Sequence, residues 1–426
     1  MASREYQTNS APTTRRDFIK AGGATVAAAA LMGKAARAQE ADSTLKVGLI
    51  GCGGRGTGAV GQAIRADKNA KLVALGDVFM EKAEACLAKL KTWDIADRVV
   101  VDEEHLFDDF DNYKGVVDSC DVVVLVTPPQ FRPKHIAYAI EQGCHVFAEK
   151  PVAVDPVGVR SVLDTCRKAK QKRLSIVSGL CYRYQFAKQA TVQRIHDGAV
   201  GDIAAMEMVY NTGGLWHRGK KPEWSEMEYQ MRNWIYYDWL SGDHINEQHI
   251  HSLDKIAWVM DNVYPVKAVA SGGRIQRTDP KYGNVYDHFN TVYEWESGVK
   301  AFSSCRQWEN AATAVYDNVY GTQGTAYVQS HRIAGKDGEW VYKAEGRDDM
   351  YQNEHDALFA AIRNDEPIVD EYMCYSTLMA IMGRMSAYTG KAVTWKEALE
   401  SGLDLGPKEL AWGPAPEAKV HVPGRA

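Results

Sequence analysis

The chain has 426 residues, of which 45% are hydrophobic and 25% are charged, and its formal net charge is −5. This composition is typical of a folded globular protein, and the length predicts two domains with additional segments. The small acidic excess gives no reason to expect a nucleic acid or an anionic membrane surface as a partner.

The first 38 residues predict an export signal. The stretch TRRDFIK at 14–20 contains two adjacent arginines, a mildly apolar run follows at 21–32, and an Ala-x-Ala cleavage site lies at 36–38. This order is typical of a twin-arginine secretory signal, and the apolar run is too short to anchor the chain in a bilayer. The alternative is a disordered basic tail with a chance arginine pair. We expect the twin-arginine export machinery to carry the folded protein to the periplasm or outside the cell.

The eight cysteines have no recurring spacing, although an exported protein can contain a disulfide framework. Cys52 lies within a glycine-rich turn, and Cys120, Cys144 and Cys181 lie beside predicted strands. A protein that folds before export, in the reducing cytoplasm, keeps such cysteines as small buried thiols. We therefore expect free cysteines and no structural zinc.

A strand, a glycine-rich turn and a helix are predicted directly after the signal. The apolar run LKVGLI at 45–50 leads into Gly51, Gly53 and Gly56 with the spacing G-x-G-x-x-G, and Arg55 stands inside this turn. The first glycine permits the tight turn, the second lets the backbone approach a pyrophosphate, and the third lets the helix pack on the strand. The helix N-terminus then faces the phosphates, so the turn is predicted to bind a dinucleotide.

A second strand, KLVALGD, ends at Asp77, about twenty residues after the glycine turn. A carboxylate at this position binds the adenine ribose hydroxyls and repels a 2′-phosphate. The residue therefore favours NAD over NADP. The alternative is an ordinary solvated residue at a strand end.

The alternation of strands and helices continues to residue 180, as a doubly wound α/β fold requires. Further strands are predicted at 121–127, 144–149 and 173–180, and helices at 135–142 and 156–170. Ligands of such sheets bind beyond the carboxyl ends of the strands. We therefore expect Thr127, Pro128, Glu149 and Lys150 to face the nicotinamide end of the cofactor, in an NAD-binding Rossmann domain at 39–180.

The pattern changes after residue 180 and predicts a substrate and oligomerisation domain at 181–345. Strands follow one another without long helices, at 203–212, 266–276, 287–297, 299–308 and 324–331. This arrangement predicts an antiparallel or mixed sheet with one open face. In the last segment, 346–426, helical spacing at 353–364 and 375–390 predicts helices that pack, with a tail, across both domains.

Four stretches of the chain resemble the Gfo/Idh/MocA family, named after glucose–fructose oxidoreductase and inositol dehydrogenase. They are VGLIGCGGRG, VTPPQFRPKHIAYAIEQGCHVFAEKP, CYRY and GDHINEQHIHSLD, of which Glu149-Lys150-Pro151 is the most specific part. The resemblance covers nearly all of the chain after residue 45. It implies a Rossmann domain and a C-terminal α/β domain with a large open mixed sheet, often paired into a dimer or tetramer. The implied chemistry is hydride transfer between a nicotinamide and a hydroxyl carbon of a sugar or cyclitol.

Oxidation of an alcohol needs a base for the hydroxyl proton and a group that holds the oxygen. The resemblance implies that Lys150 binds the reacting hydroxyl. A helix is predicted to begin near Asn246, and on it Glu247 and His251 share a face, so that the carboxylate can orient the imidazole. The family usually has Asp where this chain has Glu247, which leaves open whether Glu247 or His251 touches the substrate.

Four further residues are candidates for the substrate site. Tyr182 and Arg183 follow the crossover between the domains, where a cleft is expected, and Asp254 follows on the predicted side of His251. For Tyr182 and Arg183 the alternative is domain packing, and for His249 a structural role stands beside a substrate contact. His249 and His251 point to different sides of a helix, so we expect no metal.

The segment 216–239 is rich in Trp and Tyr. We expect it to form a loop over the mouth of the active site, where aromatic rings stack on a sugar. The alternative is that these rings only anchor the loop.

Export and a nicotinamide cofactor together restrict the function. Outside the cytoplasm there is no NAD pool, so we expect a tightly bound cofactor that each catalytic cycle restores. A sugar oxidoreductase with two alternating substrates meets this condition, as does a redox-neutral glycoside hydrolase of the family's NAD-dependent, α-N-acetylgalactosaminidase-like branch. That branch replaces the lysine of Glu-Lys-Pro, so Lys150 favours the oxidoreductase. A cofactor-binding protein without turnover is expected to lose Lys150 or His251, and both are present.

Overall fold

The computed structural model describes residues 43–336 and 338–425. The predicted export signal at 1–38 therefore lies outside the described residues. The chain from Leu45 onward forms one compact unit. Within the described part of the chain, no helix combines the length and the apolar character needed to cross a membrane.

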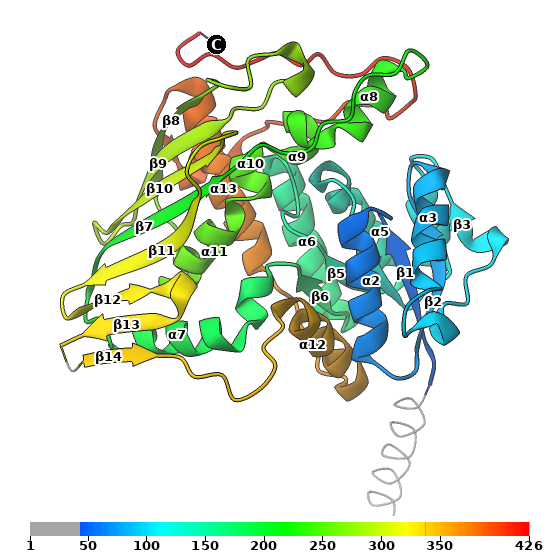
Figure 1. Cartoon of the computed structure of the whole chain (residues 1–426), viewed down its shortest axis with the longest axis horizontal. Helices are drawn as coiled ribbons and strands as arrows, with labels where there is room; N and C mark the ends of the chain where they lie inside the picture. Colours follow the sequence, from blue (N-terminus) through cyan, green and yellow to red (C-terminus); the bar gives the residue numbers. More distant parts are fainter. Residues whose placement is uncertain (1–42, 337, 426) are drawn as a thin grey trace, which may run out of the picture. The chain divides into compact units, whose positions relative to one another are not determined.

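Six parallel strands form the first sheet, in the order β3-β2-β1-β4-β5-β6. Their bounds are Leu45–Ile50 (β1), Ala70–Gly76 (β2), Leu106–Phe107 (β3), Val122–Leu125 (β4), His145–Ala148 (β5) and Ile176–Ser178 (β6). Every residue of β4 is buried, which explains its uninterrupted apolar sequence. The strand order is that of the doubly wound dinucleotide-binding fold, and it confirms the predicted Rossmann fold (Figure 1).

Helices connect these strands, as the alternation in the sequence predicts. They are α2 (Gly54–Ala66), α3 (Met80–Leu90), α4 (Asn112–Asp118), α5 (Arg132–Gln142) and α6 (Pro156–Lys172). The sequence places the start of α5 three residues too late, because Pro133 lies in its first turn, where a missing N–H breaks no helical hydrogen bond. At the start of α6, Asp155 caps the helix by accepting a hydrogen bond from the Gly158 amide at 2.8 Å.

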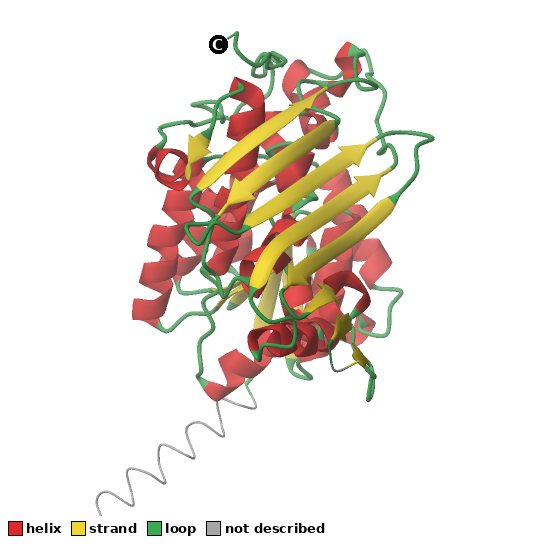
Figure 2. Ribbon diagram, turned by 90° about the vertical axis from the view of Figure 1, so that its left-hand side faces the viewer, coloured by secondary structure: helices red, strands yellow, loops and turns green. Residues whose placement is uncertain are grey.

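The second sheet has the strand order β14-β13-β12-β11-β7-β10-β9-β8-β15 and is mixed, because β7 and β10 run parallel while the other neighbours are antiparallel. The bounds are Ile203–Thr212 (β7), Lys267–Gly273 (β8), His288–Glu294 (β9), Lys300–Gln307 (β10), Ala314–Gly321 (β11), Gly324–Tyr327 (β12), Arg332–Gly335 (β13), Gly338–Val341 (β14) and Val393–Thr394 (β15). The five predicted strands are present, whereas β11, β13, β14 and β15 were not predicted. Figure 2 looks onto this sheet, with helices behind it. Val269 and Phe302 on it are each about half exposed.

The remaining helices are α7 (Phe186–His196), α8 (Glu226–Arg232), α9 (Asp238–Ser241), α10 (His244–Glu247), α11 (Ile250–Val259), α12 (Met350–Asn364), α13 (Tyr372–Thr389) and α14 (Trp395–Glu400). α12 packs against α2, and α13 packs against both α6 and β8. These two C-terminal helices therefore contact elements of the Rossmann domain, and α13 also contacts the second sheet. All eight cysteines are free and buried, as the sequence predicts.

Candidate functional site

The three glycines of the turn have different surroundings. Gly51 has a φ of +96°, and a Cβ there would lie 2.6 Å from the Val126 carbonyl carbon. A Cβ on Gly56 would collide with the Gly51 carbonyl oxygen, because α2 packs directly on the turn. Nothing lies within 4 Å of a Cβ on Gly53, so the backbone there faces open space. No side chain caps α2 at Gly53, so its first amides are available to a phosphate.

A pocket opens beside this turn and is lined by Gly51, Gly53, Asp77, Thr127 and Pro128. One Asp77 oxygen accepts a hydrogen bond from the Cys52 amide at 2.8 Å, and the other accepts from the Phe79 amide at 3.1 Å. These bonds fix the carboxylate at the end of β2, on the pocket wall. Five of the nine predicted cofactor residues therefore lie around one cavity, whereas Arg55, Gly56, Glu149 and Lys150 do not line it.

Three buried polar atoms on the wall of this pocket have no hydrogen-bond partner among the described residues. They are Asn112 Oδ1, Thr127 Oγ1 and His135 Nδ1. Buried polar groups are normally paired, so these atoms indicate a polar ligand. Burial lowers the pKa of His135 to about 3, which keeps its ring neutral. The sequence analysis missed Asn112 and His135; the only signal for His135 was its place in the family-like stretch.

Arg55 and Glu149, both expected at the cofactor, form an ion pair with one another. Arg55 also donates to Glu354 of α12 at 2.8 Å, and its guanidinium lies 4.7 Å from the ring centre of Tyr351. Burial raises the pKa of Glu354 well above its ordinary value, and the nearby Glu149 adds to this. The glycine turn is thus tied to the Glu-Lys-Pro strand end and to a helix some 300 residues later in the chain, which no sequence spacing could indicate.

The turn at Thr127 and Pro128 is held by a buried arginine. Arg132 donates to the carbonyl oxygens of Thr127 and Pro151, which follow β4 and β5. Burial lowers the pKa of Arg132 to about 10. One side chain therefore joins the two strand ends at which the nicotinamide end of the cofactor was predicted.

Lys150 pairs with Glu247 from the second domain. The Lys150 ammonium donates to the Glu247 carbonyl oxygen and, at 3.3 Å, to its carboxylate. Both side chains remain partly accessible, with 15% and 19% of their surface exposed. An ammonium and a carboxylate are therefore available at the strand end, where a hydroxyl group can reach them.

The helix predicted to begin near Asn246 is instead two helices, α10 and α11, separated by Gln248 and His249. The Asn246 side chain donates to the Ala153 carbonyl oxygen at 2.9 Å, and no hydrogen bond joins Glu247 to His251 among the described residues. The prediction that Glu247 orients the His251 imidazole was therefore wrong, since the Glu247 carboxylate instead pairs with the Lys150 ammonium.

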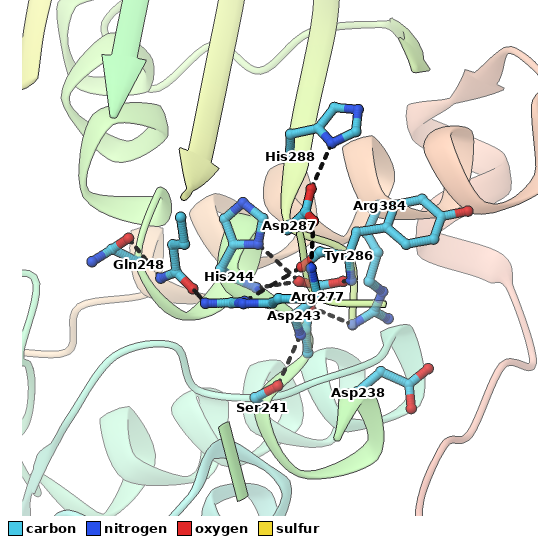
Figure 3. A network of polar contacts seen from close by, with 12 residues as sticks. Asp238, Ser241, Asp243, His244, Gln248, Arg277, Tyr286, Asp287, His288 and Arg384 are labelled. Atoms are coloured by element: carbon cyan, nitrogen blue, oxygen red, sulfur yellow. Dashed lines mark hydrogen bonds and ion pairs between the residues drawn. The ribbon is translucent and has the colours of Figure 1, made fainter. Parts of the chain in front are cut away.

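A buried polar network fixes the start of α10 (Figure 3). Asp243, with a φ of +68°, accepts hydrogen bonds from the amides of His244 and Tyr286 and from the Tyr388 hydroxyl, at 2.6, 2.7 and 2.7 Å. Burial alone would raise the pKa of Asp243, but the hydrogen bonds from His244 and its other partners hold it below its ordinary value. Arg384 donates to the Gly242 carbonyl oxygen at 2.9 Å, so α13 also supports this turn.

His251 is partly buried, and its Nδ1 atom is buried without a hydrogen-bond partner in the described part of the chain. Burial lowers its pKa well below the ordinary value, and Lys150 adds to this effect. Its ring makes an edge contact with Tyr182, with ring centres 5.3 Å apart. The ammonium groups of Lys255 and Lys188 lie 4.4 and 5.1 Å from the centre of the Tyr182 ring. His251 is therefore a neutral imidazole in edge contact with the Tyr182 ring.

The other substrate candidates are engaged with one another or buried. Arg183 forms a two-pronged ion pair with Asp254, at 2.8 to 3.1 Å, and lies 3.9 Å from the ring centre of Tyr372. His249 is fully buried and shares a 2.6 Å hydrogen bond with the Ser303 hydroxyl. This geometry favours the packing alternative for Arg183 and the structural alternative for His249, and Asp254 is the partner of Arg183. In the described residues, no group of three or more His, Cys, Asp or Glu side chains could hold a metal ion.

Comparisons with known proteins identify the family of this chain. Residues 45–177 match the model of the oxidoreductase family with an NAD-binding Rossmann fold, and residues 189–327 match the GFO/IDH/MocA C-terminal domain. The chain belongs to the GFO/IDH/MocA oxidoreductase family. Residues 12–32 match the signal sequence of the twin-arginine translocation pathway, so this family member carries an export signal.

Individual relatives of this GFO/IDH/MocA oxidoreductase are distant. Inositol 2-dehydrogenase from Rhizobium meliloti is 25% identical over 68% of this chain and 77% of its own length. A glycosyl hydrolase family 109 protein from Porphyromonas gingivalis is 26% identical over 39% of this chain and 34% of its own length. The chain spans about half or less of the length of several curated relatives that it matches.

The fold of this GFO/IDH/MocA oxidoreductase also occurs among solved structures. Aldose-aldose oxidoreductase from Caulobacter crescentus aligns with a TM-score of 0.63 at 20% identity, over 82% of this chain and 99% of that chain. At this identity the likeness concerns the fold alone.

Proposed function

We propose that this chain is an exported oxidoreductase that holds NAD tightly and transfers a hydride between the nicotinamide and a hydroxyl carbon of a sugar or cyclitol. The observation that carries the proposal is the accessible pair of Lys150 and Glu247 at the end of β5, in the sheet whose glycine turn is shaped for a dinucleotide. A bound nicotinamide supplies the hydride acceptor. The family match and the paired strand ends support the assignment.

The residues of the chain bind the hydroxyl group, accept its proton and hold the cofactor. Lys150 holds the hydroxyl oxygen and stabilises the negative charge that develops on it, and Glu247 positions the ammonium. His251 receives the hydroxyl proton, because burial keeps its imidazole neutral and able to accept one. Gly53, Asp77 and Thr127 hold the cofactor at the pyrophosphate, the ribose and the strand end.

Export explains why the cofactor must stay bound. A protein in the periplasm or outside the cell meets no NAD pool, so each oxidation has to be followed by a reduction on the same cofactor. We infer that two sugar-type substrates alternate in the site. The half-exposed Val269 and Phe302 on the second sheet support a homo-oligomer formed through that sheet.

The test is the absorption spectrum of the purified protein. We expect a bound nicotinamide whose band changes when free sugars or cyclitols are added. Lys150→Ala should retain the cofactor but lose the change, whereas Lys168→Ala, at an exposed position of α6, should respond like the unaltered protein. A Lys150→Ala protein that still responds fully would show that another residue handles the hydroxyl.

A redox-neutral NAD-dependent glycoside hydrolase is the second candidate, and the Porphyromonas gingivalis relative favours it. Incubation with aryl glycosides separates the two functions. Release of the aglycone without formation of a keto-sugar would support the hydrolase, and formation of a keto-sugar from a free sugar would support the oxidoreductase. If neither product forms, the result would indicate a cofactor-binding protein without turnover.

A further inference from the structure

The dinucleotide pocket continues past Asp77 into a space with aromatic walls. Phe79, Phe110 and Phe131 line it from the Rossmann domain. Asp77 marks the ribose end of the site, so aromatic side chains beside it suit the adenine ring. This part of the pocket therefore decides how firmly the adenosine half is held.

The opposite wall comes from the aromatic segment 216–239. Met231 on α8 and Trp234 just after it line the same pocket as the glycine turn. We expected this segment over the mouth of the active site, and its Met231 and Trp234 side chains lie on the wall of the pocket beside the glycine turn. Trp216, at the other end of the segment, is 44% exposed.

An arginine fastens the aromatic segment to the Rossmann domain. Arg232 forms an ion pair with Glu81 of α3 at 2.8 Å, and its guanidinium lies 3.8 Å from the ring centre of Phe79. The wall formed by Met231 and Trp234 is thus attached to the helix that follows the ribose-binding strand.

The C-terminal tail, residues 402–425, passes beside α8 (Figure 1, red). Trp412 contacts two rings of the pocket wall, Phe79 and Phe110, with ring centres 5.7 and 4.9 Å apart. The Gly413 carbonyl oxygen accepts from the Met227 amide at 2.9 Å, and the Pro416 carbonyl oxygen accepts from the Gln230 side chain at 2.9 Å. The tail therefore packs on both walls.

The tail is also anchored on either side of Trp412. Before it, the Leu405 amide donates to Asp155 at 3.0 Å. After it, the ring of His421 stacks on Tyr388 with centres 4.1 Å apart, and its carbonyl oxygen accepts from the Tyr286 hydroxyl at 2.9 Å. A segment held at both ends cannot swing aside without breaking one set of contacts.

We infer that Met231, Trp234 and Trp412 complete the adenosine site and that the tail, clamped by Trp412, sets how slowly the dinucleotide leaves. This inference rests on the proposed function, because it concerns the same cofactor. It assigns the tight binding that export requires to two segments outside the Rossmann domain.

The test compares cofactor release in three variants of the exported protein. Each is purified, its bound nucleotide is extracted and quantified, and release is followed by displacement with excess ethenoadenine dinucleotide. Trp412→Ala and Trp234→Ala should each release NAD about tenfold faster, since the first loses the contacts with Phe79 and Phe110 and the second removes a side chain from the pocket wall. Trp216→Ala, at an equally exposed tryptophan away from the pocket, should match the unaltered protein.

The outcomes separate the two proposals. Trp412 is 42% exposed, so its replacement should leave the melting temperature nearly unchanged and allow a clean comparison. Equal release rates in the Trp412→Ala and unaltered proteins would overturn the inference while leaving the proposed function intact. An unaltered protein that neither contains nor binds a nicotinamide dinucleotide would overturn both.

Discussion

At the scale of single residues, two glycines of the turn are expected to differ in role: Gly53 in cofactor binding and Gly56 in stability. A Cβ on Gly53 meets nothing within 4 Å, whereas one on Gly56 collides with backbone. We expect Gly53→Ala to change the free energy of unfolding by no more than about 0.5 kcal/mol and to weaken NAD binding more than about tenfold. Gly56→Ala should lower the free energy of unfolding by about 3 kcal/mol, because helix and turn must separate.

Chemical denaturation and NAD titration of both variants measure these effects. Normal NAD affinity in Gly53→Ala would contradict a pyrophosphate at that backbone. The sequence alone was sufficient to predict the tight turn at Gly51 and the close packing at Gly56, because both depend on local spacing. It could not indicate Asn112 or the Glu354 partner of Arg55, since these residues meet the turn only through the tertiary fold.

At the scale of elements, the pair of Arg183 and Asp254 joins the crossover segment to α11. Both side chains are almost fully buried, with 9% and 1% of their surface exposed. Arg183→Met should lower the free energy of unfolding by about 3–5 kcal/mol, because it leaves a buried carboxylate without its partner. The double variant R183M/D254L should recover part of this loss. Urea denaturation measures both, and an equally unstable double variant would contradict the pairing argument.

The elements also show where sequence patterns stop being informative. The alternation of apolar residues predicted the long strands except β11, whereas β13, β14 and β15 have only two to four residues, too few for a period to be recognised. The break between α10 and α11 was not predicted because tertiary contacts cause it: Asn246 bonds to Ala153, and Asp243 bonds to Tyr286 and Tyr388. The prediction that Glu247 orients His251 depended on an unbroken helix and was wrong for the same reason.

At the scale of the whole molecule, folding buries three histidines as neutral rings. Burial is the main cause that lowers the pKa of each one, and they are His135, His249 and His355. The unfolded chain protonates them near the ordinary pKa of about 6.5. Below that pH the unfolded state binds more protons, so these groups lower the free energy of unfolding as the pH falls. Glu354 and Asp370, whose pKa values burial raises, act in the opposite direction.

Because the groups oppose one another, the effect is best measured as a difference between two proteins. Burial lowers the pKa of His249 to about 3, so its folded ring stays neutral at pH 5 while its unfolded ring is protonated. The stabilisation that His249 contributes at pH 7 should therefore be smaller by about 2 kcal/mol at pH 5. Urea denaturation of the unaltered protein and of His249→Asn at pH 7, 6 and 5 measures this change, since all other titrating groups cancel. A difference that stays constant over this range would mean that the imidazole takes up a proton in the folded state, and the buried bond to Ser303 would not be the contact of a neutral ring.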